Sequence, residues 1–140
     1  MKKMATMAVT AAVLALPATA FGETVRQSGF IKGDKAATVK LRVKVTGGDA
    51  KKVGGFKAKN VRARCEKGPI RITLSALTPV KVDSDNGFKV RLNDGEGGVL
   101  RISGKVKDDG RKTVGNLKTN EFQSGSQTCK VAKQKFSTSA

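Results

Sequence analysis

Apolar and polar residues alternate strictly along residues 38–45. The apolar phase is Val39, Leu41, Val43 and Val45, and the cationic phase is Lys40, Arg42 and Lys44. A period of two places one phase on the buried face of a β-strand, whereas a helix would scatter the same side chains around its axis. The segment therefore predicts a half-buried strand.

The same alternation recurs in three later segments, at residues 70–74, 88–92 and 100–107. Ile, Val, Leu or Phe occupies one phase in each, and Lys, Arg, Ser or Thr occupies the other. Each segment is short and is bounded by turn-forming residues, which is typical of strands. We therefore expect four strands from this pattern alone.

The phase of the pattern changes near the middle of the chain. Phe56 and Ala58 share one phase, whereas Val61 and Cys65 share the other. One extra residue at positions 59–60 would restore a common inward face, which is typical of a β-bulge. We predict a bulge or a break there.

Runs of Gly, Asp and Asn separate the alternating segments, at residues 47–49, 85–87, 93–95 and 109–110. These residue types tolerate the positive φ of tight hairpins, so consecutive strands are expected to be antiparallel neighbours. After the first twenty residues no window has helical spacing of apolar side chains, so no substantial helix is expected. The prediction is an all-β fold, a single antiparallel β-sandwich, immunoglobulin-like or jelly-roll-like, with about seven to nine strands.

The first twenty residues have the order of a secretory signal peptide. Lysines at positions 2–3 precede an uncharged stretch from Met4 to Leu16, and small residues at 18–20 supply an A-x-A cleavage signal. The apolar stretch is shorter than the roughly 20 residues of a membrane span, so no transmembrane anchor is expected. We expect cleavage after residue 20, or alternatively after residue 22, and a secreted, periplasmic or envelope-associated protein. Residues 21–140 then form one domain, with a frayed end at residues 137–140.

Both cysteines, Cys65 and Cys129, lie in the part that would be exported. An oxidising compartment lets a disulfide persist, and two cysteines allow a single intramolecular pairing. We therefore predict a Cys65–Cys129 disulfide, with two free buried thiols as the alternative. Two cysteines without histidine fall short of the four ligands of a zinc site.

The chain is strongly basic, with 28 Lys and Arg against 11 Asp and Glu, a net charge of +17. Without the two lysines of the signal peptide, 26 basic residues remain against 11 acidic, a net charge of +15. Such a field attracts polyanions. The sequence has no histidine, which excludes Ser-His-Asp and Cys-His catalysis and any histidine-ligated metal.

Six carboxylates form three close pairs that a glycosidase could use in principle. They are Asp83 with Asp85, Asp94 with Glu96, and Asp108 with Asp109. All lie in predicted turns, where acids bond to their own backbone. An EF-hand loop beginning at Asp83 requires a glycine at position 88 and normally a glutamate at position 94. The chain has Phe88 and Asp94 at these positions, with its glycine at Gly87 instead. No catalytic residue, metal site or cofactor is therefore predicted.

Several segments together resemble a loosely characterised family of small secreted β-sandwich proteins of high-GC Gram-positive bacteria. They are Gln27–Phe30, Val53–Phe56 leading into Val61–Cys65, Gly87–Val90, Leu100–Val106, Gly115–Leu117 and Thr128–Lys130. The resemblance implies the sandwich and the disulfide but no known activity. This chain departs from the family at Phe136, where the last strand often carries a tryptophan.

Eleven cations occupy the outward phases of the expected strands and are the candidate polyanion-binding residues: Lys40, Arg42, Lys44, Arg62, Arg64, Arg71, Lys89, Arg91, Arg101, Lys105 and Lys107. Neighbouring strands would align them into basic stripes. The plainer interpretation is that they keep a small domain soluble and its edges unpaired.

Two functional hypotheses follow from this pattern. The first is a binding module for an anionic polymer such as teichoic acid, acidic polysaccharide, lipopolysaccharide or extracellular DNA. The alternative is a structural or protein-interaction domain that pairs with an envelope protein or with itself. The sequence does not predict the oligomeric state.

Overall fold

The computed structural model describes residues 22–140, so the predicted signal peptide lies outside the described residues. The strands are β1 (Glu23–Ile31), β2 (Asp34–Thr46), β3 (Asp49–Cys65), β4 (Ile70–Ala76), β5 (Val80–Lys81), β6 (Gly87–Asn93), β7 (Val99–Lys107), β8 (Lys112–Thr119), β9 (Phe122–Ser124), β10 (Gln127–Lys130) and β11 (Gln134–Ser139). Within residues 22–140 the one helical element is a 3-10 turn, Asp108–Gly110. No helix in this range has the length and apolarity needed to cross a membrane. The predicted all-β antiparallel fold without substantial helix is confirmed, and short segments such as β5 and β9 raise the strand count to eleven.

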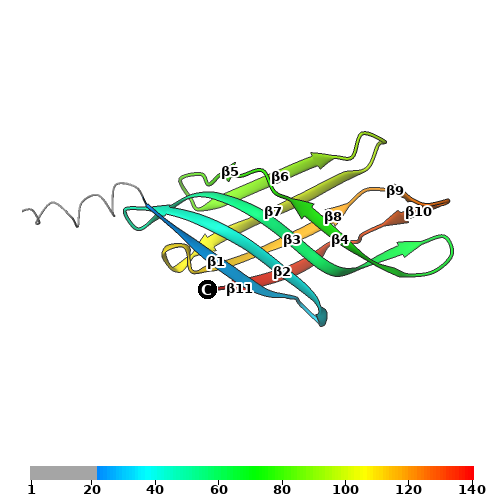
Figure 1. Cartoon of the computed structure of the whole chain (residues 1–140), viewed down its shortest axis with the longest axis horizontal. Coiled ribbons are helices and arrows are strands. Elements are labelled where there is room, and N and C mark those ends of the chain that lie inside the picture. Colours follow the sequence, from blue (N-terminus) through cyan, green and yellow to red (C-terminus); the bar gives the residue numbers. More distant parts are fainter. Residues whose placement is uncertain (1–21) are drawn as a thin grey trace, which may run out of the picture.

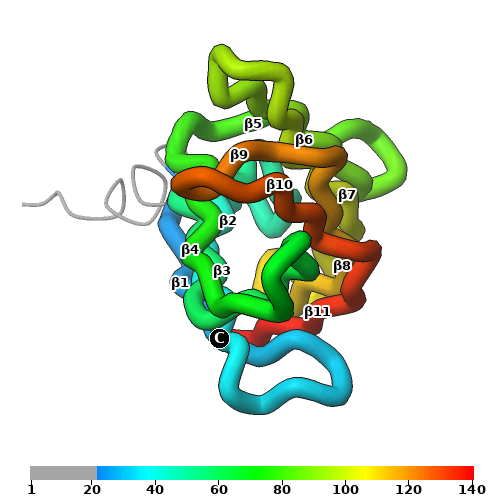
Figure 2. The backbone as a smooth tube through the Cα atoms, turned by 90° about the vertical axis from the view of Figure 1, so that its right-hand side faces the viewer, coloured from blue at the N-terminus to red at the C-terminus, as the bar shows by residue number. Residues whose placement is uncertain are grey.

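The strands form one antiparallel sheet in the order β6-β7-β8-β11-β1-β2-β3-β10-β9, and β4 and β5 also pair with β3. This sheet folds over itself into two layers, with β1 to β4 in one layer and β6, β7, β8 and β11 in the other (Figure 1). Seen end-on, the two layers surround a common interior, and the pairing of β11 with β1 joins them (Figure 2). The outward surfaces of the layers therefore point away from each other.

The alternating segments of the sequence are strands β2, β4, β6 and β7, as predicted. Leu41 and Ile102 are each 2% exposed, and Ile72 and Val90 are half-buried against the core. Their cationic neighbours are exposed, because alternate side chains of a strand point to opposite faces. Hydrocarbon burial between the layers is thus the main stabilising contribution to the fold.

The bulge predicted at positions 59–60 is confirmed. The register of β3 against β4 shifts between Ala58 and Val61, and Asn60 has a φ of 59°. The side-chain amide of Asn60 donates a hydrogen bond to the carbonyl oxygen of Ala36 (3.3 Å). The extra residue keeps Ala58 and Val61 both in the core, where neither is exposed.

Aromatic rings and glycines share one inward row across four strands. Phe88, Gly104, Gly115 and Phe136 are direct neighbours on β6, β7, β8 and β11. A Cβ on Gly115 would lie 2.8 Å from Cζ of Phe136, so the ring occupies the space above that glycine. Phe136 also contacts Phe56 of the other layer edge to face, with ring centroids 5.6 Å apart. This ring therefore fills the interior between the two layers.

The expected frayed end at residues 137–140 is wrong. Strand β11 lies between β8 and β1 and bonds to both. Thr138 is 1% exposed, and its hydroxyl donates to Oε1 of Gln27 (2.7 Å), whose Nε2 donates to the carbonyl oxygen of Gly110 (2.6 Å). Pairing on both sides and burial hold this segment in place, which a polar sequence ending in Ser-Thr-Ser-Ala does not indicate.

The predicted disulfide between Cys65 and Cys129 is confirmed. The two residues face each other directly in the pairing of β3 with β10 and are separated by 64 positions in sequence. Cys129 is buried, and the chain has no free cysteine. The bridge fastens the β9–β10 hairpin to the end of β3.

Candidate anion-binding surface

Acidic residues are absent from the interior of every described strand. Glu23, Asp34 and Asp49 are the first residues of β1, β2 and β3, and the remaining eight acids lie in connections. Across residues 22–140 one ion pair forms, between Arg71 and Asp34. Apart from Arg71, the cations that project from the described strands therefore form no ion pair with an acid.

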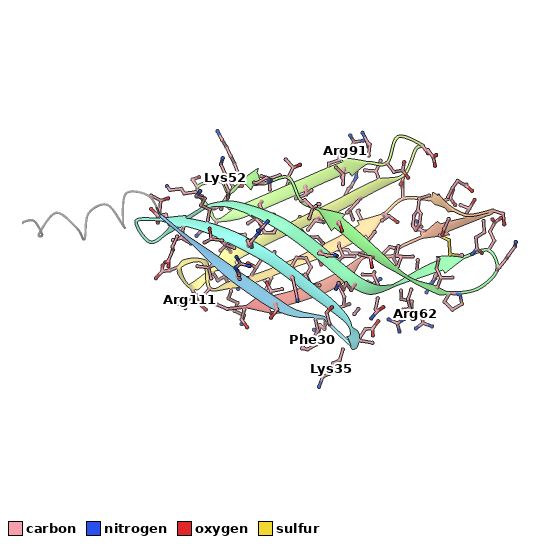
Figure 3. All side chains as sticks on the ribbon, in the orientation of Figure 1. Phe30, Lys35, Lys52, Arg62, Arg91 and Arg111 are labelled. Carbon is pink, nitrogen blue, oxygen red and sulfur yellow. A yellow bond between two sulfur atoms is a disulfide. The ribbon has the colours of Figure 1, made fainter. Side chains whose placement is uncertain are left out.

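All eleven cations predicted as candidate binding residues are exposed, but they do not form one patch. Lys40, Arg42 and Lys44 lie on β2; Arg62, Arg64 and Arg71 lie on β3 and β4 near the disulfide end; Lys89, Arg91, Arg101, Lys105 and Lys107 lie on β6 and β7. Figure 3 shows the labelled cations Lys52, Arg62, Arg91 and Arg111 at widely separated places on the molecule. The charge is divided among both layers and one end.

The densest group lies on the outer surface of β6, β7, β8 and β11. Arg91, Arg101 and Lys118 are direct neighbours in register on the first three of these strands, which places their backbones about 4.8 Å apart. We call this surface the β6–β11 face and define it by its outward cations, which are Lys89, Arg91, Arg101, Lys105, Lys107, Lys112, Lys118 and Lys135. A shallow hollow of about 330 Å³ on it is lined by Arg91, Arg101, Lys118 and Lys133.

The other layer carries a second basic surface. Lys40 lies opposite Lys57 and Lys44 lies opposite Lys52 in the pairing of β2 with β3. Arg42 is less available to a ligand, because its guanidinium packs over Gly55. A Cβ on that glycine would lie 2.6 Å from Nε of Arg42. A second set of exposed cations therefore lies on the opposite side of the molecule and can be compared with the β6–β11 face: Lys40, Lys44 and Lys57.

Arg71 differs from the other predicted candidates because its charge is already used within the fold. Its Nη1 donates to the carboxylate of Asp34 and to the carbonyl oxygen of Asn60 (2.9 Å). These bonds tie β4 to the start of β2 and to the bulge in β3. We assign Arg71 a structural role.

Sequence reasoning missed Lys112, Lys118 and Lys135, although all three belong to the β6–β11 face. Neither β8 nor β11 shows a clear apolar alternation, because their inward positions include Gly115 and Thr138. The sequence offered only a local signal for two of them, because Lys118 follows the buried Leu117 and Lys135 precedes the buried Phe136.

The paired acids form turns, as their positions predicted. Oδ1 of Asp83 accepts hydrogen bonds from the backbone amides of Asp85 (3.2 Å) and Gly87 (2.8 Å). The side chain of Asp85, then the backbone amide of Gly87 and more weakly the backbone amide of Asp85 and the nearby charge of Lys105, lower the pKa of the Asp83 carboxyl. Within residues 22–140 no group of three or more His, Cys, Asp or Glu side chains is placed to hold a metal ion.

Comparisons with protein-family models, with curated proteins and with solved structures each return no match. Function is therefore inferred from the geometry and charge of the surface.

Proposed function

We propose that this domain is a non-enzymatic binding module for anionic polymers of the cell envelope or its surroundings. The observation that carries the proposal is the β6–β11 face, with eight outward cations on four strands that contain no acid. Binding to such a surface is led by charge and is weakened by salt. The order of residues 1–20 and the disulfide support an exported location, where such polymers are met.

Retention on a heparin column is the direct test. We expect the domain to elute only above physiological ionic strength, about 0.15 M. The triple variant Arg91→Gln, Arg101→Gln, Lys118→Gln should elute earlier, and the slope of log affinity against log salt should fall by about one for each cation removed.

The matched control removes three cations from the opposite layer, by Lys40→Gln, Lys44→Gln and Lys57→Gln. A clearly smaller loss of retention in this control supports the β6–β11 face. Equal losses would mean that total charge alone decides binding. Elution of the unmodified domain at trivially low salt would refute the proposal.

A second candidate function is protein interaction through an open sheet edge. β4 pairs only with β3 and β6 only with β7, so each has an unpaired side, to which another strand can add. A mainly apolar hollow of about 300 Å³ lies between them, lined by Ile72, Leu74 and Phe122 and by Leu92, which is 44% exposed. If this hollow binds protein, crosslinking should capture a partner or a second copy, and Leu92→Arg should abolish the capture. A monodisperse monomer without crosslinked partners would contradict this candidate.

A further inference from the structure

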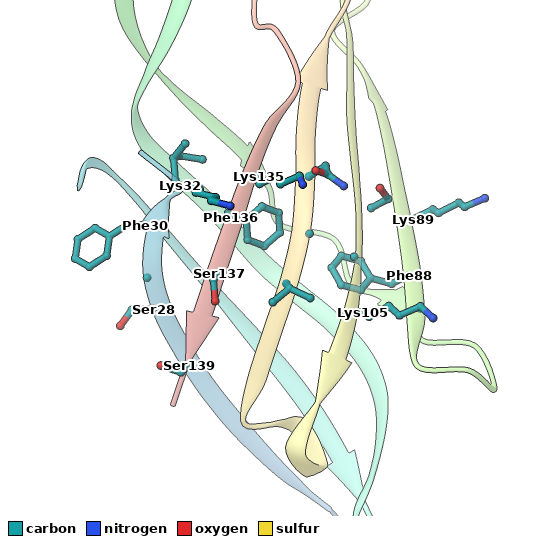
Figure 4. Close-up of a pocket in the computed structure, with 18 of the residues that line it drawn as sticks. Ser28, Phe30, Lys32, Phe88, Lys89, Lys105, Lys135, Phe136, Ser137 and Ser139 are labelled. Atoms are coloured by element: carbon teal, nitrogen blue, oxygen red, sulfur yellow. The ribbon is translucent and has the colours of Figure 1, made fainter. Parts of the chain in front are cut away.

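A trough runs across the outer surface of β6, β7, β8, β11 and β1, with a volume of about 1140 Å³ (Figure 4). Lys89 and Lys105 border it on the side of β6 and β7, whereas Lys32 and Lys135 border it on the side of β11 and β1. Asp83 and Asp85 also line it, but the lysines of the lining outnumber these two acids. The volume exceeds that of most small-molecule sites, and the trough is open, which suits a segment of a polymer.

The floor of the trough is low because its side chains are short. Ser103, Asn116 and Ser137 supply hydroxyl and amide groups. Strands β1 and β11 also approach closely there, since a Cβ on Gly29 would fall 1.9 Å from the carbonyl oxygen of Ser137. A ligand can therefore lie close to the backbone between the lysines.

One row of the register shows how charge and hydroxyl groups are arranged. Lys89, Ser103, Asn116 and Lys135 are consecutive neighbours across β6, β7, β8 and β11. The backbones of the two lysines are thus about 14 Å apart, at three strand spacings. Between them, Oδ1 of Asn116 is buried and has no hydrogen-bond partner in the protein. A ligand hydroxyl would satisfy this amide after a side-chain rotation, and the lysines would bind anionic groups on either side.

Phe30 lies at the margin of the trough on β1 and is 49% exposed. Phe56, Phe88 and Phe136 are buried and Phe122 is half-buried, so Phe30 is the one exposed phenylalanine among residues 22–140. Its neighbour across the strand pair is Ser137 of the floor. An exposed ring beside hydroxyl groups and lysines offers an apolar platform to the C–H face of a sugar.

One feature favours an acidic sugar polymer over a nucleic acid. Single-stranded nucleic acids are bound by several aromatic rings that stack on successive bases, whereas this trough presents one exposed ring. Its lysines act as point charges that can bind the carboxylates of such a polymer.

We propose that the trough binds a carboxylate-bearing polysaccharide, with one sugar ring stacked on Phe30 and carboxylates at the lysines on both sides. This inference rests on the proposed function and narrows it to one class of polymer and one surface.

Calorimetry with four probes at one ionic strength tests the inference. The probes are an oligogalacturonate, an oligoglutamate and a single-stranded oligonucleotide of equal charge, and neutral dextran. We expect the oligogalacturonate to bind most tightly, because it alone combines carboxylates with sugar rings. Phe30→Ala should weaken its binding about fivefold and leave oligoglutamate binding unchanged. Phe30→Trp should restore the affinity.

The lysine variants separate charge from sugar recognition. Lys105→Gln with Lys135→Gln should weaken both oligogalacturonate and oligoglutamate, whereas the Lys40, Lys44 and Lys57 control should preserve the preference for oligogalacturonate. Thermal unfolding of each variant checks that the fold is intact. Equal affinity for all three anions, tighter binding of the oligonucleotide, or no effect of Phe30→Ala would overturn this inference and leave the proposed function standing. Failure of every polyanion to bind would overturn both.

Discussion

Replacing both Cys65 and Cys129 with alanine is expected to lower the free energy of unfolding by about 4 kcal/mol. The bridge joins positions that are 64 residues apart, and closing a loop of that size restricts the unfolded chain strongly. Domains of this size are stable by only about 5–15 kcal/mol, so the loss is a large part of the total. Urea denaturation followed by circular dichroism measures it.

The reduced wild-type domain provides the control for this experiment. It should unfold at the same urea concentration as the double alanine variant, since both lack the bridge and keep the same strands. A loss below about 1 kcal/mol would contradict the expectation and show that the β9–β10 hairpin is held mainly by other contacts.

Phe136→Ala should lower the free energy of unfolding by about 3–5 kcal/mol. The ring is 2% exposed, packs edge to face on Phe56 and covers Gly115, so its removal leaves a cavity between the layers. The same urea titration measures this loss.

Phe30→Ala is the matched control, because it removes the same atoms from a ring that is half exposed. Its cost should be much smaller than that of Phe136→Ala, since surface substitutions usually change stability by about 0.5 kcal/mol or less. Similar costs at the two positions would contradict the assignment of Phe136 to the core.

The strands that sequence reasoning identified are those whose inward positions are hydrocarbon. In β2 the buried positions include Val39, Leu41 and Val43, so the period of two is plain. Strands β1, β8 and β11 bury polar or small residues instead, such as Gln27 and Thr113. In these strands exposed and buried side chains alternate, but polar and apolar residue types do not. The sequence alone therefore does not show the period of two.

The candidate surface was predictable to the same extent. Arg91 and Arg101 were assigned correctly to the outward phase of recognised strands. Lys118 completes their row only because of the register between β7 and β8. Lys135 lies across the trough from Lys89 only because β11 pairs with β8. Pairings between distant segments are set by the packing of the whole domain, so they could not be derived from local pattern.

The pairing of β1 with β11 also affects how fast the domain folds. The bond between Thr138 and Gln27 spans 111 positions, so the pairing of β1 with β11 forms only when segments from nearly opposite ends of the described chain have met. Bringing such distant segments together costs loop-closure entropy before any contact compensates for it. β-Proteins with similarly distant contacts fold in about milliseconds to seconds. Until that encounter, strands β1 and β11 each have an unpaired side, and such open edges favour aggregation of the incompletely folded chain.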